Sequence, residues 1–203
     1  MSWRLAGFAG GVLALWAAVG SPLAALDHQL LTIHMVQHLL LMTVSAPLIL
    51  LSLRRTPLHR AHPVFCWLAS TAVVIGWHVP VLFQLGMHSQ AWHAVEHASF
   101  FVGGLLFWWP VVQPWPRWPR WSVPLYLFLA TLPCDALSAF LTFCGRVVYP
   151  HYLSAPRLLD LSPLADQEAA GALMWVWVTF AYLVPAVVVT IQLLSPQRRA
   201  EVV

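Results

Sequence analysis

Two pairs of histidines, each four positions apart, are the clearest chemical feature of this sequence. His34 and His38 lie in the stretch HMVQHLLLMT, and His93 and His97 lie in HAVEH. Residues four apart share one face of a helix, so each pair can offer two imidazole nitrogens to one metal ion. Imidazole binds zinc, copper, iron and nickel. If both segments are helical, the spacing predicts metal ligation.

Other side chains along the chain could complete such a site. His78 is expected to be a fifth ligand, and Glu96 to orient a ligand histidine as a hydrogen-bonded carboxylate. Asp135 falls in another apolar segment and is an accessory candidate. Thioether sulfur suits copper(I), so Met35 and Met174 slightly favour copper over zinc.

The composition places these residues in a membrane protein. Of the 203 residues, 60% are hydrophobic and 8% are charged, and the mean hydropathy is +0.75. A soluble domain carries about 25% charged residues. The sequence has no basic helix face and no interleaved basic and aromatic surface, so nucleic acid is not expected as a partner. Membrane lipid is therefore the expected surroundings.

Six apolar segments reach the roughly 20 residues that a helix needs to cross a bilayer. The sequence predicts an all-α, polytopic transmembrane bundle that forms one domain over residues 1–203. Its spans are expected at about 5–25, 28–52, 65–87, 91–112, 122–143 and 170–194. The first span is expected to remain uncleaved, because Pro22 or Leu23 would stand where a signal peptidase needs a small residue.

The arginines predict the orientation of the bundle. Two of them, Arg146 and Arg157, fall on one side, and the others fall on the side of both termini: Arg4, Arg54, Arg55, Arg60, Arg117, Arg120, Arg198 and Arg199. Positively charged connections stay in the cytoplasm, so both termini are predicted to be cytoplasmic. His34, His38, His78 and His97 then lie about 9 to 15 Å from the outer ends of their helices, and His93 lies one turn above His97. We expect one polar layer in the outer half of a bacterial cytoplasmic membrane.

An ionisable group inside a span is costly unless it is paired or faces a cavity, so this layer is a candidate functional site. Metal ligation is favoured over a purely structural network of hydrogen-bonded histidines. HAVEH also matches the HxxEH pattern of inverted zinc peptidases. An intramembrane zinc hydrolase using Asp135 and Glu96 is therefore the alternative function. A haem protein with axial histidines from neighbouring helices is a third hypothesis.

Four stretches, in this order, resemble the CtaG family of cytochrome c oxidase assembly factors, of the polytopic membrane type: HMVQHLLLMTVSAPLILLS, WHVPVLFQ, AWHAVEHASFFVGGLLFWWPV and DQEAAGALMW. The resemblance covers about residues 3–195. The family's His and Met positions correspond to His34, Met35, His38, His78, His93 and His97. Its DQ…GG…MW pattern corresponds to Asp166, Gln167, Gly171, Met174 and Trp175. Ala170 replaces the first glycine of that pattern, which removes no ligand.

The resemblance implies a protein that is not an enzyme and that helps to mature haem–copper oxidases. Copper, as copper(I), would come from a donor on the outer side, bind the histidines and pass to oxidase subunits docked in the membrane. Asp166 and Gln167, just outside the last predicted span, are expected to line or gate the mouth of the site.

Overall fold

A computed structural model of the protein describes residues 2–22, 24–53, 62–113, 119–157 and 160–195. Within these ranges every regular element is a helix, which confirms the predicted all-α class. The long helical segments are α1 (Ser2–Val19), the uninterrupted run of α2 (Leu31–Leu39), η2 (Leu40–Ser45) and α3 (Ala46–Ser52), α4 (Pro63–His78), α6 (Gln90–Val112), α7 (Ser122–Phe143) and α9 (Pro163–Leu194). The short helices are η1 (Ala24–Leu26), α5 (Pro80–His88) and α8 (His151–Ser154).

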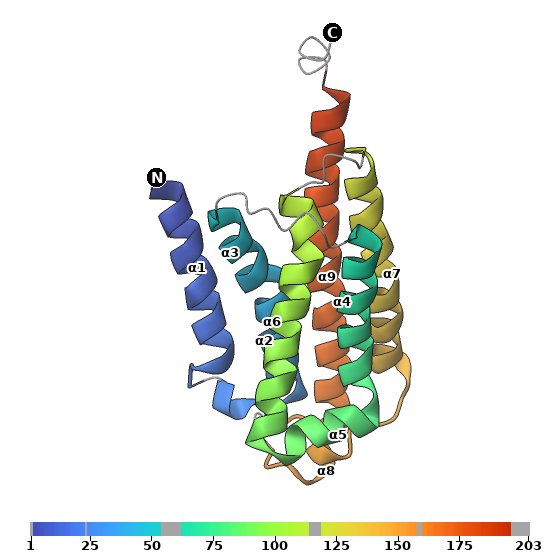
Figure 1. Ribbon diagram of the computed structural model, residues 1–203. Coiled ribbons are helices and arrows are strands. Elements are labelled where there is room, and N and C mark those ends of the chain that lie inside the picture. Colours follow the sequence, from blue (N-terminus) through green and yellow to red (C-terminus); the bar gives the residue numbers. More distant parts are fainter. Residues whose placement is uncertain (1, 23, 54–61, 114–118, 158–159, 196–203) are drawn as a thin grey trace.

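The long helices form a ring around an apolar core. α2 packs against α9, α9 against α7, α7 against α4 and α4 against α6, and α6 closes the ring against η2 and α3. α1 lies outside this ring, against η2 and α3 (Figure 1). The start of α1 and the end of α9 lie at the same end of the bundle, whereas α5 and α8 cover the opposite end, which we call the α5 end.

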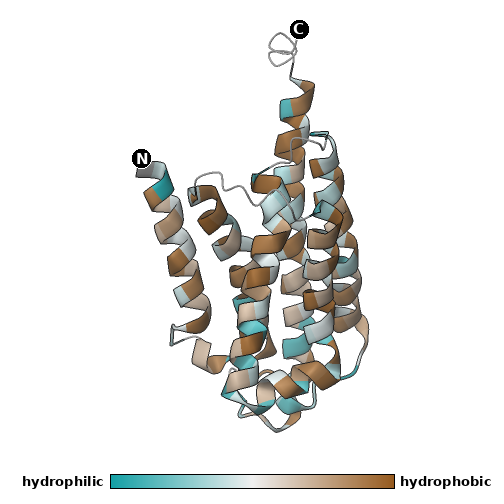
Figure 2. Cartoon of the chain, viewed as in Figure 1, coloured by the Kyte–Doolittle hydropathy of each residue, from teal (hydrophilic) through white to brown (hydrophobic). Residues whose placement is uncertain are grey.

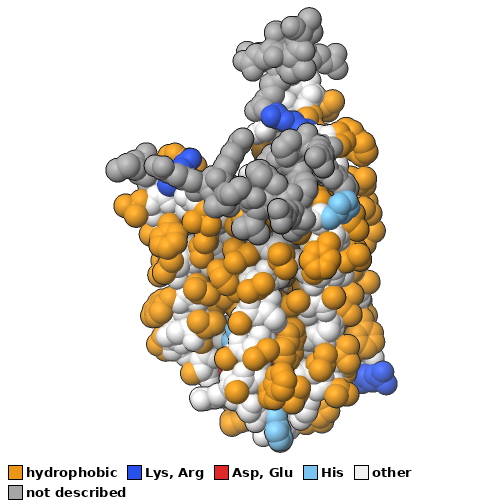
Figure 3. Space-filling view, viewed as in Figure 1, with side chains coloured by type: hydrophobic (Ala, Val, Ile, Leu, Met, Phe, Trp, Pro, Cys, Tyr) orange, Lys and Arg blue, Asp and Glu red, His pale blue; other side chains and the backbone are white. Residues whose placement is uncertain are grey.

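The exterior of the bundle is apolar enough for a membrane. Five helical segments in the described ranges have the length and hydropathy of a membrane span, and α4 with α5 makes a sixth if the bent pair crosses as one. Figure 3 shows hydrophobic side chains over the middle of one face. Figure 2 shows hydrophilic positions gathered where α2, α4 and α6 approach α5. The chain is therefore an integral membrane protein, and its buried histidine and acidic side chains lie toward the α5 end of the bundle.

The predicted third span, residues 65–87, corresponds to a pair of helices with a sharp bend between them. α4 ends at His78, and α5 turns away from it by 75° and runs across the α5 end (Figure 1). Pro80 explains the break, because the residue before a proline is disfavoured in helical geometry and proline is well suited to begin the next helix. Val79 accordingly has φ −65° and ψ 126°. His78 therefore lies at the end of a helix and not within one.

A second irregularity lies within the second span. η2 is π-helical, so the Ala46 amide donates to the Leu41 carbonyl, five residues earlier. The next bond of this kind would need an amide hydrogen on Pro47, which proline does not have. The Met42 carbonyl instead accepts a hydrogen bond from the indole Nε1 of Trp108, on α6, at 2.9 Å. The hydrogen bonding of this helix therefore depends on α6.

The last helix begins well before the predicted residue 170. α9 starts at Pro163, and the Ser162 hydroxyl caps it by accepting a hydrogen bond from the Ala165 amide at 3.1 Å. A serine cap followed by proline in the first turn is a strong start signal for a helix. The prediction concerned the apolar span and followed hydropathy, whereas the first turns of α9 are polar and precede that span.

These additional turns of α9 place Asp166 against the start of α2. Its carboxylate accepts hydrogen bonds from the Leu31 amide at 2.6 Å, the Thr32 amide at 3.2 Å and the Thr32 hydroxyl at 2.6 Å. The first amides of a helix have no partner within it. Asp166 thus caps α2 from another helix, immediately before the turn that carries His34.

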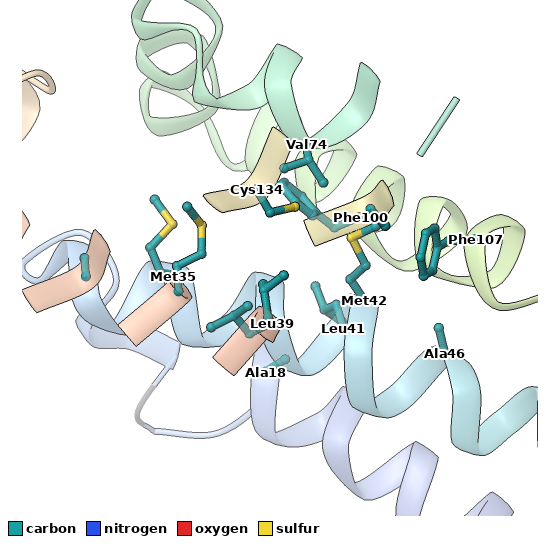
Figure 4. Packing of buried hydrophobic residues seen from close by; sticks show 14 of the residues in the cluster. Ala18, Met35, Leu39, Leu41, Met42, Ala46, Val74, Phe100, Phe107 and Cys134 are labelled. Atoms are coloured by element: carbon teal, nitrogen blue, oxygen red, sulfur yellow. The ribbon is translucent and has the colours of Figure 1, made fainter. Parts of the chain in front are cut away.

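The core between these helices is closely packed. Figure 4 shows side chains from the second span, with residues of α4, α6 and α7 opposite them: Met35, Leu39, Met42 and Ala46 against Val74, Phe100, Phe107 and Cys134. α6 comes closest to η2 at Gly104, where an added Cβ would lie 2.8 Å from Met42 Cα and 2.9 Å from Ala46 Cβ. Only a glycine allows the two backbones to approach in this way.

Gly104→Ala is expected to destabilise the protein by about 1–3 kcal/mol, because the new methyl group would force α6 away from η2. The neighbouring Gly103→Ala is the matched control, because its Cβ would make ordinary contacts with Val73 at 3.7 Å. Thermal unfolding in detergent would show a lower midpoint for Gly104→Ala only. Equal midpoints for the two variants would contradict the close approach.

Asp166→Ala is expected to lower the free energy of unfolding by about 1–3 kcal/mol, because it leaves the first amides of α2 without an acceptor. Glu168→Ala removes the same charge two residues further along α9, outside this cap, and serves as the control. Hydrogen exchange of the Leu31 and Thr32 amides would be faster in Asp166→Ala alone. Unchanged protection of these amides would show that the cap does not hold the start of α2.

Candidate metal centre

Three helices bring the predicted histidines together near the α5 end. α2 carries His34 and His38, α6 carries His93 and His97, and α4 ends at His78. The ring centroids of His34 and His93 lie 5.5 Å apart, and those of His38 and His97 lie 5.8 Å apart. The His78 ring lies 6.2 Å from that of His38. The two pairs therefore face one another, and His78 lies beside them.

His34, His38 and Glu96 form a group that we call the buried triad, whose candidate ligand atoms all lie within 4.8 Å of one another. Glu96 Oε1 lies 3.2 Å from His34 Nε2 and 3.4 Å from His38 Nε2. The side chains of His34 and Glu96 are fully buried. The Nδ1 atoms of both histidines and Glu96 Oε2 have no hydrogen-bond partner among the described residues. A buried polar atom without a partner costs about 1–3 kcal/mol, so these atoms fit a site built for a ligand.

The buried triad is closed by the break between α4 and α5. Because α5 crosses the end of the bundle, its Gly86 lies over the Glu96 carboxylate, and a Cβ there would lie 2.5 Å from Glu96 Oε2. Phe100 covers the other side, with its ring stacked 3.7 Å from that of His38. The triad is thus enclosed within the bundle, and none of its three side chains is more than 5% exposed.

His78 and Met35 add two further donors beside the buried triad. His78 Nδ1 lies 2.7 Å from the Val74 carbonyl, which can only accept, so Nδ1 carries the ring hydrogen. Nε2 is then left with a free lone pair, the form in which a histidine binds a metal. This Nε2 lies 3.3 Å from Met35 Sδ. The His78 imidazole and the Met35 thioether thus lie close enough to bind one metal ion together.

Asp27, His93 and His97 form a second group, the groove triad, whose ligand atoms also lie within 4.8 Å of one another. His93 Nε2 lies 3.4 Å from Asp27 Oδ2. The triad borders a cavity of about 700 Å³ between α1 and α6, which is also lined by Leu15 and Phe101. Small acidic and histidine patches are visible among the hydrophobic side chains on the lower part of this face in Figure 3.

Asp27 was missed by the sequence analysis because it falls between the first two predicted spans. Its carboxylate is nevertheless buried, with only 5% of the side chain exposed. An isolated acidic residue directly before a histidine, at the start of an apolar segment, was the signal that could have identified it. Four of the five predicted histidines are thus divided by the structure between two triads, each with its own carboxylate, and His78 belongs to neither.

Two tyrosines from the segment around α8 hold the backbone at this end. Tyr149 donates to the His78 carbonyl at 3.1 Å, which the helix break has freed, and Tyr152 donates to the Asp27 carbonyl at 2.8 Å. Burial raises the pKa of both hydroxyls, so they remain protonated donors at neutral pH. The loop that carries α8 therefore fixes the backbone of one residue beside each triad.

Two accessory candidates, Asp135 and Met174, are members of neither triad. Asp135 is on α7, beside Thr131 and Thr179, and belongs to neither triad. Met174 is buried in the core on α9. Asp135 thus has hydrogen-bond partners on α7 and α9, and Met174 packs in the apolar core.

Asp166 and Gln167 lie in the first turns of α9, before residue 170, where the predicted span begins. Asp166 caps α2, as described above. The Gln167 side chain holds the segment after α7, because its Oε1 accepts from the Val148 amide at 2.7 Å and its Nε2 donates to the Arg146 carbonyl at 3.0 Å. Both side chains position the elements around the site.

Comparison with known protein families matches this chain, over residues 1–195, to the cytochrome c oxidase caa3 assembly factor family (Caa3_CtaG). Comparisons with curated proteins and with solved structures found no match. The matched region contains both triads together with Asp166 and Gln167. Because the family model covers nearly the whole sequence, the chain belongs to the Caa3_CtaG family of cytochrome c oxidase assembly factors.

Proposed function

We propose that this protein binds copper at the buried triad and delivers it to a haem–copper oxidase during assembly. The observation that carries the proposal is the convergence of imidazoles from α2, α4 and α6 in an apolar interior. Several of their ring nitrogens lack hydrogen-bond partners among the described residues, including both nitrogens of His38. A purely structural network would satisfy such buried atoms.

Copper fits the donor set better than zinc does. Imidazole nitrogen binds both metals, but the thioether of Met35 beside His78 is a soft donor that suits copper(I). The oxidases that this family helps to assemble contain copper, which gives the ion a destination. Subunits of a haem–copper oxidase are thus the proposed acceptors, and a copper donor on the outer side is the proposed source.

The arginines support an outward-facing α5 end in a bacterial cytoplasmic membrane. Arg4 lies at the end of the bundle where α1 begins and α9 ends, whereas Arg146 follows α7 at the α5 end. The remaining arginines of the sequence strengthen this bias, because most of them precede or follow spans at the end that carries Arg4. The positive-inside rule then places both triads in the outer half of the membrane.

The enclosure of the buried triad speaks against the alternative, an intramembrane zinc hydrolase. Such an enzyme needs a metal-bound water and a carboxylate that substrate can approach. The Glu96 and His34 side chains are fully buried, and Glu96 is covered by α5 at Gly86. We therefore assign no catalytic residue.

His38→Ala and His34→Ala are each expected to lower copper affinity by about tenfold or more, because each removes a ligand of the buried triad. His88→Ala is the control, because it removes an exposed histidine at the same end of the molecule. Copper(I) bound per chain would be measured after equilibrium dialysis of the purified proteins. Equal copper content in all three variants and the unaltered protein would refute copper binding at this site.

Cells that lack the protein should contain an oxidase with low activity and low copper content. Added copper should restore part of both if the protein supplies the ion. Re-expressing His38→Ala should restore less activity than re-expressing His88→Ala, at equal amounts of each variant in the membrane. If His38→Ala restored full oxidase activity, the assembly role would not depend on copper binding at the buried triad.

A reporter fused to the C-terminus is expected to be active in the cytoplasm, and a tag inserted at Ser154 of α8 is expected to react from outside the membrane. Both follow from the orientation proposed above. Reaction of the Ser154 tag only after the membrane is opened would reverse the orientation and place the triads in the inner half.

A further inference from the structure

We infer that the groove triad of Asp27, His93 and His97 is a second copper position, which receives the ion before the buried triad does. The inference rests on the proposed function, because it describes how copper reaches the site named there. Asp27 lies in the turn that follows η1, and His93 and His97 lie on α6.

The first support is a continuous row of imidazoles from the surface to the interior. His28 is 47% exposed at its side chain, and its ring lies 5.3 Å from that of His93. The His93 ring is stacked 5.5 Å from His34, the deepest member of the buried triad. The His151 ring lies 5.6 Å from that of His28 and extends the row at the surface.

The second support is the state of the ligand atoms. His93 Nε2 and His97 Nε2 are shielded from solvent and have no hydrogen-bond partner among the described residues. The carboxylate of Asp27 is almost fully buried, and it lies within ion-pair distance of both His93 and His28. The two imidazoles are donors that copper accepts, and the Asp27 carboxylate adds a negative charge beside the ion.

The third support is access. The groove triad lines the cavity of about 700 Å³ between α1 and α6, together with small residues such as Ala94 and Ala98. The buried triad does not line that cavity, because none of His34, His38 and Glu96 contributes to its wall. An ion that arrives through the groove therefore meets Asp27, His93 and His97 first.

The step between the two positions is an exchange of ligands. Bonds from copper to His93 and His97 are replaced by bonds to His34 and His38, whose rings lie 5.5 to 5.8 Å away for the pairs that face each other. The ion neither gains nor loses an electron. Asp27 at the first position and Glu96 at the second each supply a negative charge, which offsets the cost of a cation in an apolar bundle.

The test is the rate at which purified protein takes copper(I) from its coloured complex with a chelating dye, followed by the loss of the dye complex's absorbance. Asp27→Asn is expected to slow uptake by about tenfold or more. Ala94→Phe fills the cavity without changing a ligand and should also slow uptake. Ala91→Phe adds the same bulk to an exposed position of α6 outside the cavity and should match the unaltered protein.

The outcomes separate this inference from the proposed function. If Asp27→Asn and Ala94→Phe take up copper as fast as the unaltered protein, the groove triad is not on the path, although the buried triad can still be the binding site. If His38→Ala keeps the full copper content, the proposed function fails instead. Unaltered protein that takes no copper from the dye would overturn both.

Discussion

The rest of the structure depends on one constraint, which is the burial of the Glu96 carboxylate in an apolar helical bundle. A carboxylate far from water is costly unless positive or hydrogen-bonding groups surround it. His34 and His38 are held against the same oxygen of Glu96 at 3.2 and 3.4 Å, so α2 and α6 must keep one register relative to each other. The register is maintained away from the site by the approach of Gly104 to Met42 and by the bond from Trp108 to the Met42 carbonyl.

The two helix irregularities serve this arrangement. A membrane helix tolerates a break only where the freed backbone groups find partners within the protein. At the α4–α5 break, Tyr149 satisfies the His78 carbonyl, and at η2, Trp108 satisfies the Met42 carbonyl. The first break also turns α5 across the bundle, where it encloses Glu96. Both prolines, Pro80 and Pro47, thus lie where the backbone must depart from a regular helix.

The family pattern that is richest in polar residues serves this support. Asp166 caps α2, Gln167 holds the segment after α7, and Gly171 lets α9 approach α7, where an added Cβ would lie 2.9 Å from the Thr142 amide nitrogen. These residues are far along the chain from the histidines, and Asp166 fixes the start of the helix that carries His34 and His38. This part of the family pattern therefore supports the scaffold around the site.

The sequence by itself determined the class of the protein, most of its spans and the histidine pairs, because hydropathy and the spacing of residues along one helix are local properties. His34 with His38 and His93 with His97 could be predicted to share helix faces for the same reason. Only the tertiary structure decided that Asp27 joins the groove triad, that Asp135 lies elsewhere and that Asp166 caps a distant helix. These outcomes depend on how each helix is rotated and on which helices are neighbours, and packing between segments far apart in the chain sets both.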